Sequence, residues 1–121
     1  NRTAGLRVPI SNPENRRVEN RLGGADANPY LAIAASLACG YLGMMEGLKP
    51  TAPITGSAYD LPFALPLTLA DALALLRGSK PLVEMFGERF VAAYCAVKEN
   101  EFDTFSRVIS SWEREHLLLN V

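Results

Sequence analysis

The sequence is poor in the residues from which many catalytic and metal sites are built. Its 121 residues include one histidine and two cysteines. Cysteine and histidine do not occur at zinc-site spacing, and neither a Walker-type glycine-rich loop nor a serine nucleophile elbow is present. These absences argue against a zinc protein, a P-loop nucleotide site and a serine hydrolase. For His116, the single histidine, a surface or packing role is favoured over catalysis.

Long apolar runs and disulfide-forming cysteines are also scarce. The longest apolar run covers residues 30–45, which is shorter than the ~20 residues needed to span a bilayer. We therefore expect a buried helix there and no membrane association. Cys39 and Cys95 lie within apolar helical patterns and are too few for a disulfide scaffold. We expect both to be small apolar residues in a cytoplasmic protein.

Lysine is absent from the first 21 residues, whereas arginine is concentrated there. The five arginines are Arg2, Arg7, Arg16, Arg17 and Arg21. The planar fork of an arginine matches phosphate and carboxylate oxygens, so this segment is typical of a site for small anions. Nucleic-acid binders usually carry a larger basic excess and aromatic stacking platforms, but no aromatic residue precedes Tyr30. We expect no nucleic-acid partner.

The charges around residue 19 follow the two-residue period of a strand. In an extended strand Arg17, Glu19 and Arg21 would share one face. One interpretation is a solvated strand edge guarded by charges. The other is an anion site with a carboxylate at its centre, which suits phosphoryl transfer because positioning and charge neutralisation dominate that chemistry. Glu19 would then bind Mg²⁺ or pair with an arginine.

The segment order predicts an α+β fold with its strands at the N-terminal end. Residues 1–24 predict two short strands joined by a proline-containing turn. Residues 25–49 predict a helix that starts after Asn28 with Pro29 in its first turn and ends at Gly47. Because apolar residues lie on nearly every side of this helix, we expect it to be buried all round.

The remainder of the chain predicts a loop and then helices. Residues 50–67 contain four prolines and predict a long surface loop. Residues 68–121 predict a helical region, with Thr68 as the first cap and a capping box at Ser110 and Glu113, followed by an apolar tail that we expect to dock on another surface. The expected core stripe of its longest helix comprises Phe90, Tyr94, Val97, Phe105 and Val108.

Three stretches resemble a known family in order and spacing. They are "NRTAGLRVP", "RRVENRLGGADANPYLAIAASLACGYLG" and "GSAYDLP". Together they resemble the C-terminal part of the glutamine synthetase family, most specifically in the R-x-E-x-R segment followed by "GADANPYL". The resemblance covers essentially the whole chain and is weak after Pro66. It implies a ligase that uses ATP with Mg²⁺ or Mn²⁺ to phosphorylate the γ-carboxylate of glutamate before an amine displaces the phosphate.

The resemblance also implies roles for particular residues. Glu19 matches a metal-binding glutamate, and Arg21 matches the arginine that holds the glutamate substrate. The arginines that match contacts to ATP phosphates and to the transferred phosphoryl group are Arg2, Arg7 and Arg17, with Arg2 as the catalytic one. Tyr59 aligns with a tyrosine that some bacterial relatives adenylylate, and loop packing is its alternative role.

Two further stretches indicate a branch of the family. "ACGYLGMMEGLKP" and "SSWEREHLLLNV" are more similar to γ-glutamylpolyamine synthetases than to ammonia-using enzymes. We therefore expect putrescine or a related amine as the acceptor, with ammonia as the alternative. A non-catalytic module that binds anions or promotes assembly is the other reading.

Length sets a limit on what this chain can do. Family members are several times longer and form stacked hexameric rings, so the resemblance implies a homo-oligomeric dodecamer for the full-length protein. The chain also begins with Asn rather than Met. We expect it to be the C-terminal part of such an enzyme, holding one wall of the active site, and to be inactive alone.

Overall fold

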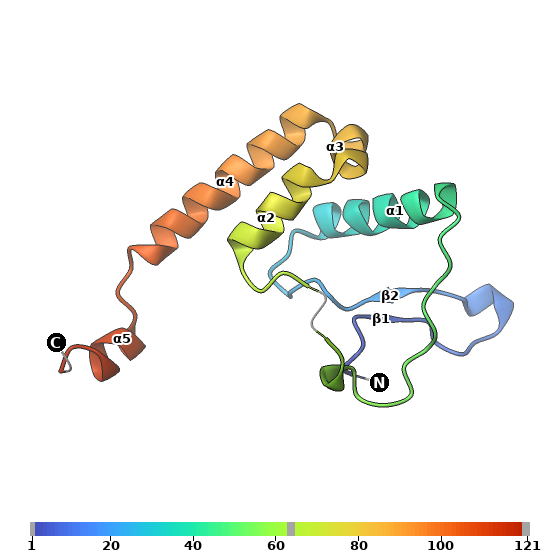
Figure 1. The fold of residues 1–121 in the computed structure, drawn as a ribbon, viewed down its shortest axis with the longest axis horizontal. Helices are drawn as coiled ribbons and strands as arrows, with labels where there is room; N and C mark the ends of the chain where they lie inside the picture. The colour runs from blue at the N-terminus through green and yellow to red at the C-terminus, as the bar shows by residue number, and fades with distance from the viewer. Residues whose placement is uncertain (1, 63–64, 120–121) are drawn as a thin grey trace. The chain divides into compact units, whose positions relative to one another are not determined.

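The computed structural model describes residues 2–62 and 65–119. The chain divides into two compact units, Asn1–Leu65 and Pro66–Val121. The first unit contains a two-stranded sheet, one long helix and a loop, and the second unit contains helices (Figure 1). Strands at the N-terminal end followed by a mainly helical region agree with the predicted order of elements.

The two strands are much shorter than the sequence suggested. β1 (Leu6–Arg7) pairs antiparallel with β2 (Glu19–Asn20), and the turn between them contains a 3₁₀ helix, η1 (Pro13–Asn15). Prolines in this stretch lack the N–H group that a strand ladder requires, which limits the pairing. Beyond the paired residues, one backbone hydrogen bond from Arg21 N to Gly5 O, at 2.8 Å, continues the contact.

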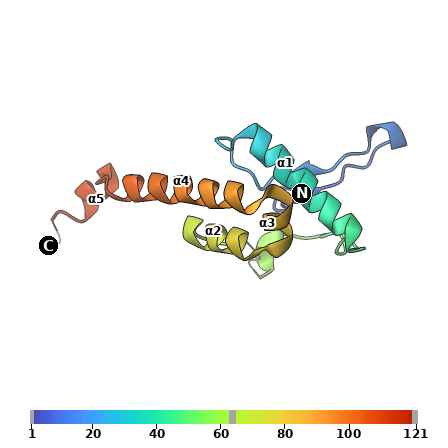
Figure 2. The ribbon, with the colours of Figure 1, turned by 90° about the horizontal axis from the view of Figure 1, so that it is seen from above.

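The long helix α1 (Pro29–Met45) begins and ends where the sequence predicted. The side chain of Asn28 accepts hydrogen bonds from Tyr30 N at 3.0 Å and Leu31 N at 3.3 Å. At the other end Gly47 has a φ of 64°, a left-handed conformation that glycine adopts without strain and that ends many helices. Seen from above, α1 crosses the strand pair (Figure 2).

The prediction that α1 is buried all round is wrong for this chain. All of α1 is described, and Ala38 is its one buried residue, at 5% exposure, whereas Cys39 is exposed. The exposed stripe of large residues is Tyr30, Ile33, Leu37, Tyr41 and Met44. A two-stranded sheet and a loop are too small to cover more than part of a helix of this length.

The loop after α1 is irregular, as predicted, apart from one helical turn. This turn is the 3₁₀ helix η2 (Ala58–Asp60), which the side chain of Ser57 caps by accepting a hydrogen bond from Tyr59 N at 3.2 Å. Residues 63–64 of the predicted loop lie outside the described residues.

The described part of the second unit, residues 66–119, contains four helices. They are α2 (Leu69–Gly78), α3 (Lys80–Phe86), α4 (Glu88–Ser106) and α5 (Ser111–His116). The side chain of Thr68 caps α2 by accepting from Asp71 N at 3.1 Å, and the capping box of Ser110 and Glu113 begins α5. Both caps were predicted. α3 connects α2 to α4, which lie side by side (Figures 1 and 2).

The core of this unit lies between α2, α3 and α4, but its residues differ from the predicted stripe. Leu73, Val91 and Cys95 are buried, and Cys95 is fully enclosed. Of the predicted stripe, Tyr94 packs against this core, whereas the residues that remain exposed are Phe90, Val97, Phe105 and Val108. α4 is nearly twice as long as α2, so its second half has too few neighbours within the unit to be covered.

The apolar tail after α5 is also uncovered in this chain. Leu117, Leu118 and Leu119 are all exposed, and the last two residues of the predicted tail lie outside the described residues. Docking of this tail on another surface therefore stays a prediction. None of the helices in the described part of the chain is long and apolar enough to cross a membrane.

Candidate active site

The strand pair places Arg7 directly opposite Glu19. Arg7 and Glu19 are register partners across β1 and β2. Their side chains form a two-point ion pair, with Arg7 Nε donating to Glu19 Oε2 at 2.8 Å and Arg7 Nη2 donating to Oε1 at 3.0 Å. Two parallel bonds of this kind exploit the planar fork of arginine. The short sheet thus fixes the one carboxylate in the middle of the arginine-rich segment.

A second arginine reaches the same carboxylate from along the strand. Arg17 Nη2 lies 3.2 Å from Glu19 Oε1, and Arg17 Nη1 donates to the backbone oxygen of Asn15 at 3.4 Å. The strand period predicted that Arg17 and Glu19 would share a face, and the structure brings them together. Two guanidinium groups around one carboxylate leave a local excess of positive charge.

These contacts keep Glu19 ionised. The hydrogen bond from Arg7 lowers the pKa of the Glu19 carboxyl; partial burial opposes this, and the charges of Arg7 and Arg17 reinforce it. The same hydrogen bond to Glu19 raises the pKa of Arg7. Glu19 retains 28% side-chain exposure, so solvent screens the pair in part. A carboxylate of this kind is a fixed negative charge and a poor proton donor or acceptor near neutral pH.

Asn20 connects the strands to α1, a role that the sequence did not reveal. Its Nδ2 donates to Ser36 Oγ of α1 at 2.9 Å, and its Oδ1 accepts from Leu22 N at 3.0 Å. The available signal was a polar residue two positions from both Val18 and Leu22. Asn20 adjoins Glu19, so this bond helps to set the position of the charged face against the helix.

Gly5 permits the close approach of the two chain segments beside Arg21. A Cβ atom at position 5 would collide with Leu22 Cδ2. The oxygen of Gly5 meanwhile accepts the hydrogen bond from Arg21 N. The backbone of Arg21, the predicted glutamate-binding residue, is therefore held against the first segment one step beyond the β1–β2 pairing.

Arg2 and Tyr59 lie at a different part of the first unit. Figure 1 shows the start of the chain next to the green helical turn at residues 58–60, and Thr3 Oγ1 accepts a hydrogen bond from Ala58 N at 2.8 Å. The side chains of Arg2 and Tyr59 are exposed. Among the described residues, neither a hydrogen bond nor an ion pair joins Arg2 to Glu19.

The described residues do not by themselves form a site for a divalent cation. Mg²⁺ takes near-octahedral oxygen coordination, but the two oxygens of Glu19 already contact arginine nitrogens. Within residues 2–62 and 65–119, no three His, Cys, Asp or Glu side chains come together as a metal site would require. The two guanidinium groups of Arg7 and Arg17 around the one carboxylate of Glu19 suit an anion better than a cation.

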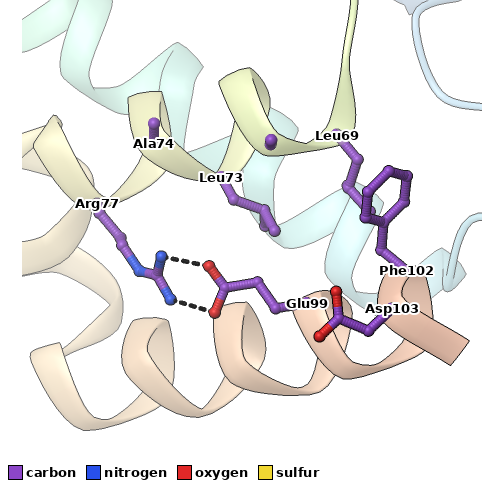
Figure 3. A pocket seen from close by; sticks show the side chains of 8 residues that line it. Leu69, Leu73, Ala74, Arg77, Glu99, Phe102 and Asp103 are labelled. Carbon is purple, nitrogen blue, oxygen red and sulfur yellow. Dashed lines mark hydrogen bonds and ion pairs between the residues drawn. The ribbon is translucent and has the colours of Figure 1, made fainter. Parts of the chain in front are cut away.

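A separate cavity of about 300 Å³ lies between α2 and α4 in the second unit (Figure 3). It is lined mainly by apolar side chains, and Arg77 donates to Glu99 at 2.5 and 2.8 Å at one end. None of the predicted site residues lines it. The ion pair joins α2 to α4.

Comparisons with known proteins identify the family of this chain. The family model described as "Glutamine synthetase, catalytic domain" matches residues 1–117. The chain belongs to the glutamine synthetase family. This confirms the resemblance read from the sequence.

Three relatives illustrate the range of activities within the family. Gamma-glutamylethanolamide synthetase of Streptomyces coelicolor is 40% identical, over 93% of this chain and 24% of that protein. Gamma-glutamylputrescine synthetase of Escherichia coli is 39% identical, over 99% of this chain and 26% of that protein. Type-1 glutamine synthetase 2 of Dictyostelium discoideum is 38% identical, over 98% of this chain and 24% of that protein. The chain spans about a quarter of the length of these curated relatives.

Proposed function

We propose that the full-length protein is an ATP-dependent carbon–nitrogen ligase that joins the γ-carboxylate of glutamate to an amine, with putrescine or a related polyamine as acceptor. The observation that carries this proposal is the placement of Glu19 between Arg7 and Arg17 on the strand pair. Phosphoryl transfer depends on positioned cationic donors more than on a strong base. This segment offers such donors and no general base.

In the proposed reaction, a γ-carboxylate oxygen of glutamate attacks the terminal phosphorus of ATP, and ADP leaves. The amine nitrogen then attacks the carbonyl carbon of the γ-glutamyl phosphate, inorganic phosphate leaves, and the amine loses a proton. Arg7 and Arg17 bind the phosphate oxygens of ATP, and Arg21 binds the glutamate substrate. Arg2 stabilises the charge on the transferred phosphoryl group.

Mg²⁺ or Mn²⁺ is part of the proposal, with Glu19 as one ligand. A bound cation supplies neutralisation of phosphate charge. Because the described residues offer a single carboxylate there, the remaining ligands must come from the rest of the full-length protein. The ion pairs hold the carboxylate of Glu19 in place and in its ionised form, the form that a cation binds.

Two local segments of the sequence, and not overall identity, favour a polyamine as acceptor. Two of the three relatives named above carry the names of γ-glutamylamide-forming enzymes, and the third carries the name of a glutamine synthetase at nearly the same identity. Overall identity therefore does not separate the acceptors. The similarity of the segments around residues 38–50 and 110–121 to the polyamine branch favours a polyamine, and ammonia is the alternative.

Assembly and regulation complete the proposal. We place the full-length protein in the cytoplasm as a homo-oligomer of stacked hexameric rings, and the exposed leucines of the apolar tail supply surface for contact between copies. Tyr59 is 78% exposed, so its hydroxyl is accessible for adenylylation. Sedimentation of the full-length protein with and without residues 117–121 tests the assembly part. Loss of large species on truncation would support it, and unchanged sedimentation would refute it.

A stand-alone anion-binding module is the rival function, because the same arginines would bind a phosphorylated ligand without chemistry. Calorimetry with ATP and with inorganic phosphate on this 121-residue chain separates the two. The ligase proposal predicts weak binding, since most of the nucleotide pocket lies elsewhere in the full-length protein. Tight binding by the chain alone would favour the module.

A further inference from the structure

We propose that Thr3 is a positioning residue that couples the loop carrying Tyr59 to the segment carrying Arg2. This inference rests on the proposed function, since it gives Arg2 a reason to be held in place. The observation is the hydrogen bond from Ala58 N to Thr3 Oγ1, at 2.8 Å. It is partly buried and joins two residues that lie 55 positions apart in the sequence.

The N–H group of Ala58 requires a hydrogen-bond acceptor from outside its own helical turn. Ala58 is the first residue of η2, and the first N–H groups of a helical turn have no acceptor within the turn itself. The neighbouring N–H of Tyr59 is satisfied by Ser57 Oγ at 3.2 Å, which leaves Ala58 N to a more distant partner. Thr3 supplies that partner, so the start of η2 is capped from another part of the chain.

The other side of the bond constrains the segment next to Arg2. Gly5 O accepts from Arg21 N at 2.8 Å, and Thr3 Oγ1 accepts from Ala58 N two residues earlier. One bond ties the segment to the strand bearing Glu19, and the other ties it to the loop bearing Tyr59. Arg2 adjoins Thr3, so the direction of its backbone depends on both bonds.

A misplacement of a reacting group by about 1 Å can lower turnover about 100-fold. Thr3 therefore affects the proposed reaction through Arg2 without touching a substrate. Any movement of the turn at residues 58–60, including one caused by a bulky group on Tyr59, would reach Arg2 through the same hydrogen bond.

The test uses the full-length protein with Thr3→Val, which keeps the shape of threonine but removes the oxygen acceptor, and Thr3→Ser, which keeps the oxygen. We expect Thr3→Val to lower kcat about tenfold or more with the KM values for ATP and glutamate nearly unchanged. Thr3→Ser should stay within about twofold of the wild type, because a serine hydroxyl can still accept the bond. Wild-type kcat in Thr3→Val would overturn the proposal.

Hydrogen exchange at the Ala58 amide reports the bond itself, independently of catalysis. We expect faster exchange at Ala58 in Thr3→Val than in the wild type, and near-wild-type exchange in Thr3→Ser. Thr104→Val is the matched control, since Thr104 Oγ1 donates to Asn100 O within α4, and it should leave both kcat and Ala58 exchange unchanged. Equal Ala58 exchange in Thr3→Val and wild type would show that the bond does not hold the loop.

A double-variant cycle separates coupling to Arg2 from a general loss of structure. If Thr3 acts through Arg2, Thr3→Val should cause no further loss of kcat in an Arg2→Ala background. An additive loss would assign the effect of Thr3→Val to general destabilisation and refute the coupling. If the wild-type protein has no ligase activity that depends on glutamate and amine, the proposed function is refuted. The hydrogen-exchange measurement still tests the Thr3–Ala58 hydrogen bond in that case.

Discussion

Arg7 and Glu19 face each other across the two strands, and their side chains form a two-point ion pair with bond lengths of 2.8 and 3.0 Å. Arg17 contacts the same carboxylate at 3.2 Å. A substrate phosphate or a metal ion that enters this site must share these groups with their present partners. Arg7 and Arg17 supply positive charge, and the carboxylate of Glu19 orients their guanidinium groups.

The proposed metal-binding role of Glu19 is tested with Glu19→Gln, which preserves the side-chain shape and removes the charge. In the full-length protein we expect the Mg²⁺ concentration that gives half-maximal activity to rise about tenfold or more, as for the loss of a metal-site group. Activity titrations with Mg²⁺ and Mn²⁺ measure this. An identical Mg²⁺ dependence in both proteins would leave Glu19 as an arginine partner only.

Arg21→Lys tests the proposed contact with the glutamate substrate. A lysine ammonium keeps the charge but cannot reproduce the two-point fork, so we expect kcat/KM for glutamate to fall about tenfold, the equivalent of one charged hydrogen bond. Steady-state kinetics measure the loss. Arg16→Lys is the matched control on the same segment, because Arg16 has no proposed role at the site. Equal kinetics for Arg21→Lys and Arg16→Lys would show that Arg21 does not bind the glutamate substrate.

The ion pair between Arg77 and Glu99 predicts a pH dependence of stability in the helical unit. The hydrogen bond from Arg77 lowers the pKa of Glu99. A lowered pKa in the folded state contributes stability that is present above the usual glutamate pKa of about 4.3 and is lost as pH falls through the folded value. We therefore expect the wild type to have a higher Tm than Glu99→Gln at pH 7, and this difference should disappear towards pH 3.

Thermal unfolding followed by circular dichroism measures this difference, which should also shrink with added salt because the pair is exposed. Glu84→Gln is the matched control, since none of the ion pairs among the described residues involves Glu84. A Tm difference between wild type and Glu99→Gln that stays constant from pH 7 to pH 3 would contradict the assignment.

The 121-residue chain alone should be helical but inactive as a ligase. Its caps and helix–helix core support helix formation, whereas Glu19, the one carboxylate between Arg7 and Arg17, cannot complete a metal site by itself. Circular dichroism should show helix, and phosphate release from ATP with glutamate and any amine should stay at background. Release that depends on glutamate and amine, and is lost in Glu19→Gln, would show that the site is complete in this chain.

Local signals in the sequence were sufficient for most of the secondary structure. Asn28 and Thr68 marked helix starts, and Gly47 marked a helix end, because caps depend on neighbouring residues alone. The alternation of Arg17 and Glu19 likewise placed both side chains on one face. Burial was predicted less well, because it depends on which elements are present to cover a helix: the apolar pattern of α1 indicated burial, but this chain has too few elements to provide it.

The sequence did not predict hydrogen bonds between residues that are far apart in the chain. The hydrogen bonds from Asn20 to Ser36 and from Ala58 to Thr3 join residues whose spacing follows no local period. The core was misassigned for a related reason, since the shorter α2 decides which face of α4 is covered, and Val91 and Cys95 lie on it instead of Phe90 and Val97. The periodicity of one helix predicts neither its distant hydrogen-bond partners nor the face that a neighbouring helix covers.

We propose that the strand pair of this chain forms one wall of a ligase site for glutamate, ATP and an amine in the full-length protein. The most direct measurement is phosphate release by the full-length protein given ATP and glutamate, with putrescine, longer polyamines, ethanolamine or ammonia supplied in turn. We expect release that requires both glutamate and an amine, is fastest with putrescine or another polyamine, and falls by orders of magnitude in Arg2→Ala. If release is fastest with ammonia, the acceptor is ammonia and not a polyamine. Release that requires neither glutamate nor amine would contradict the proposed ligase site.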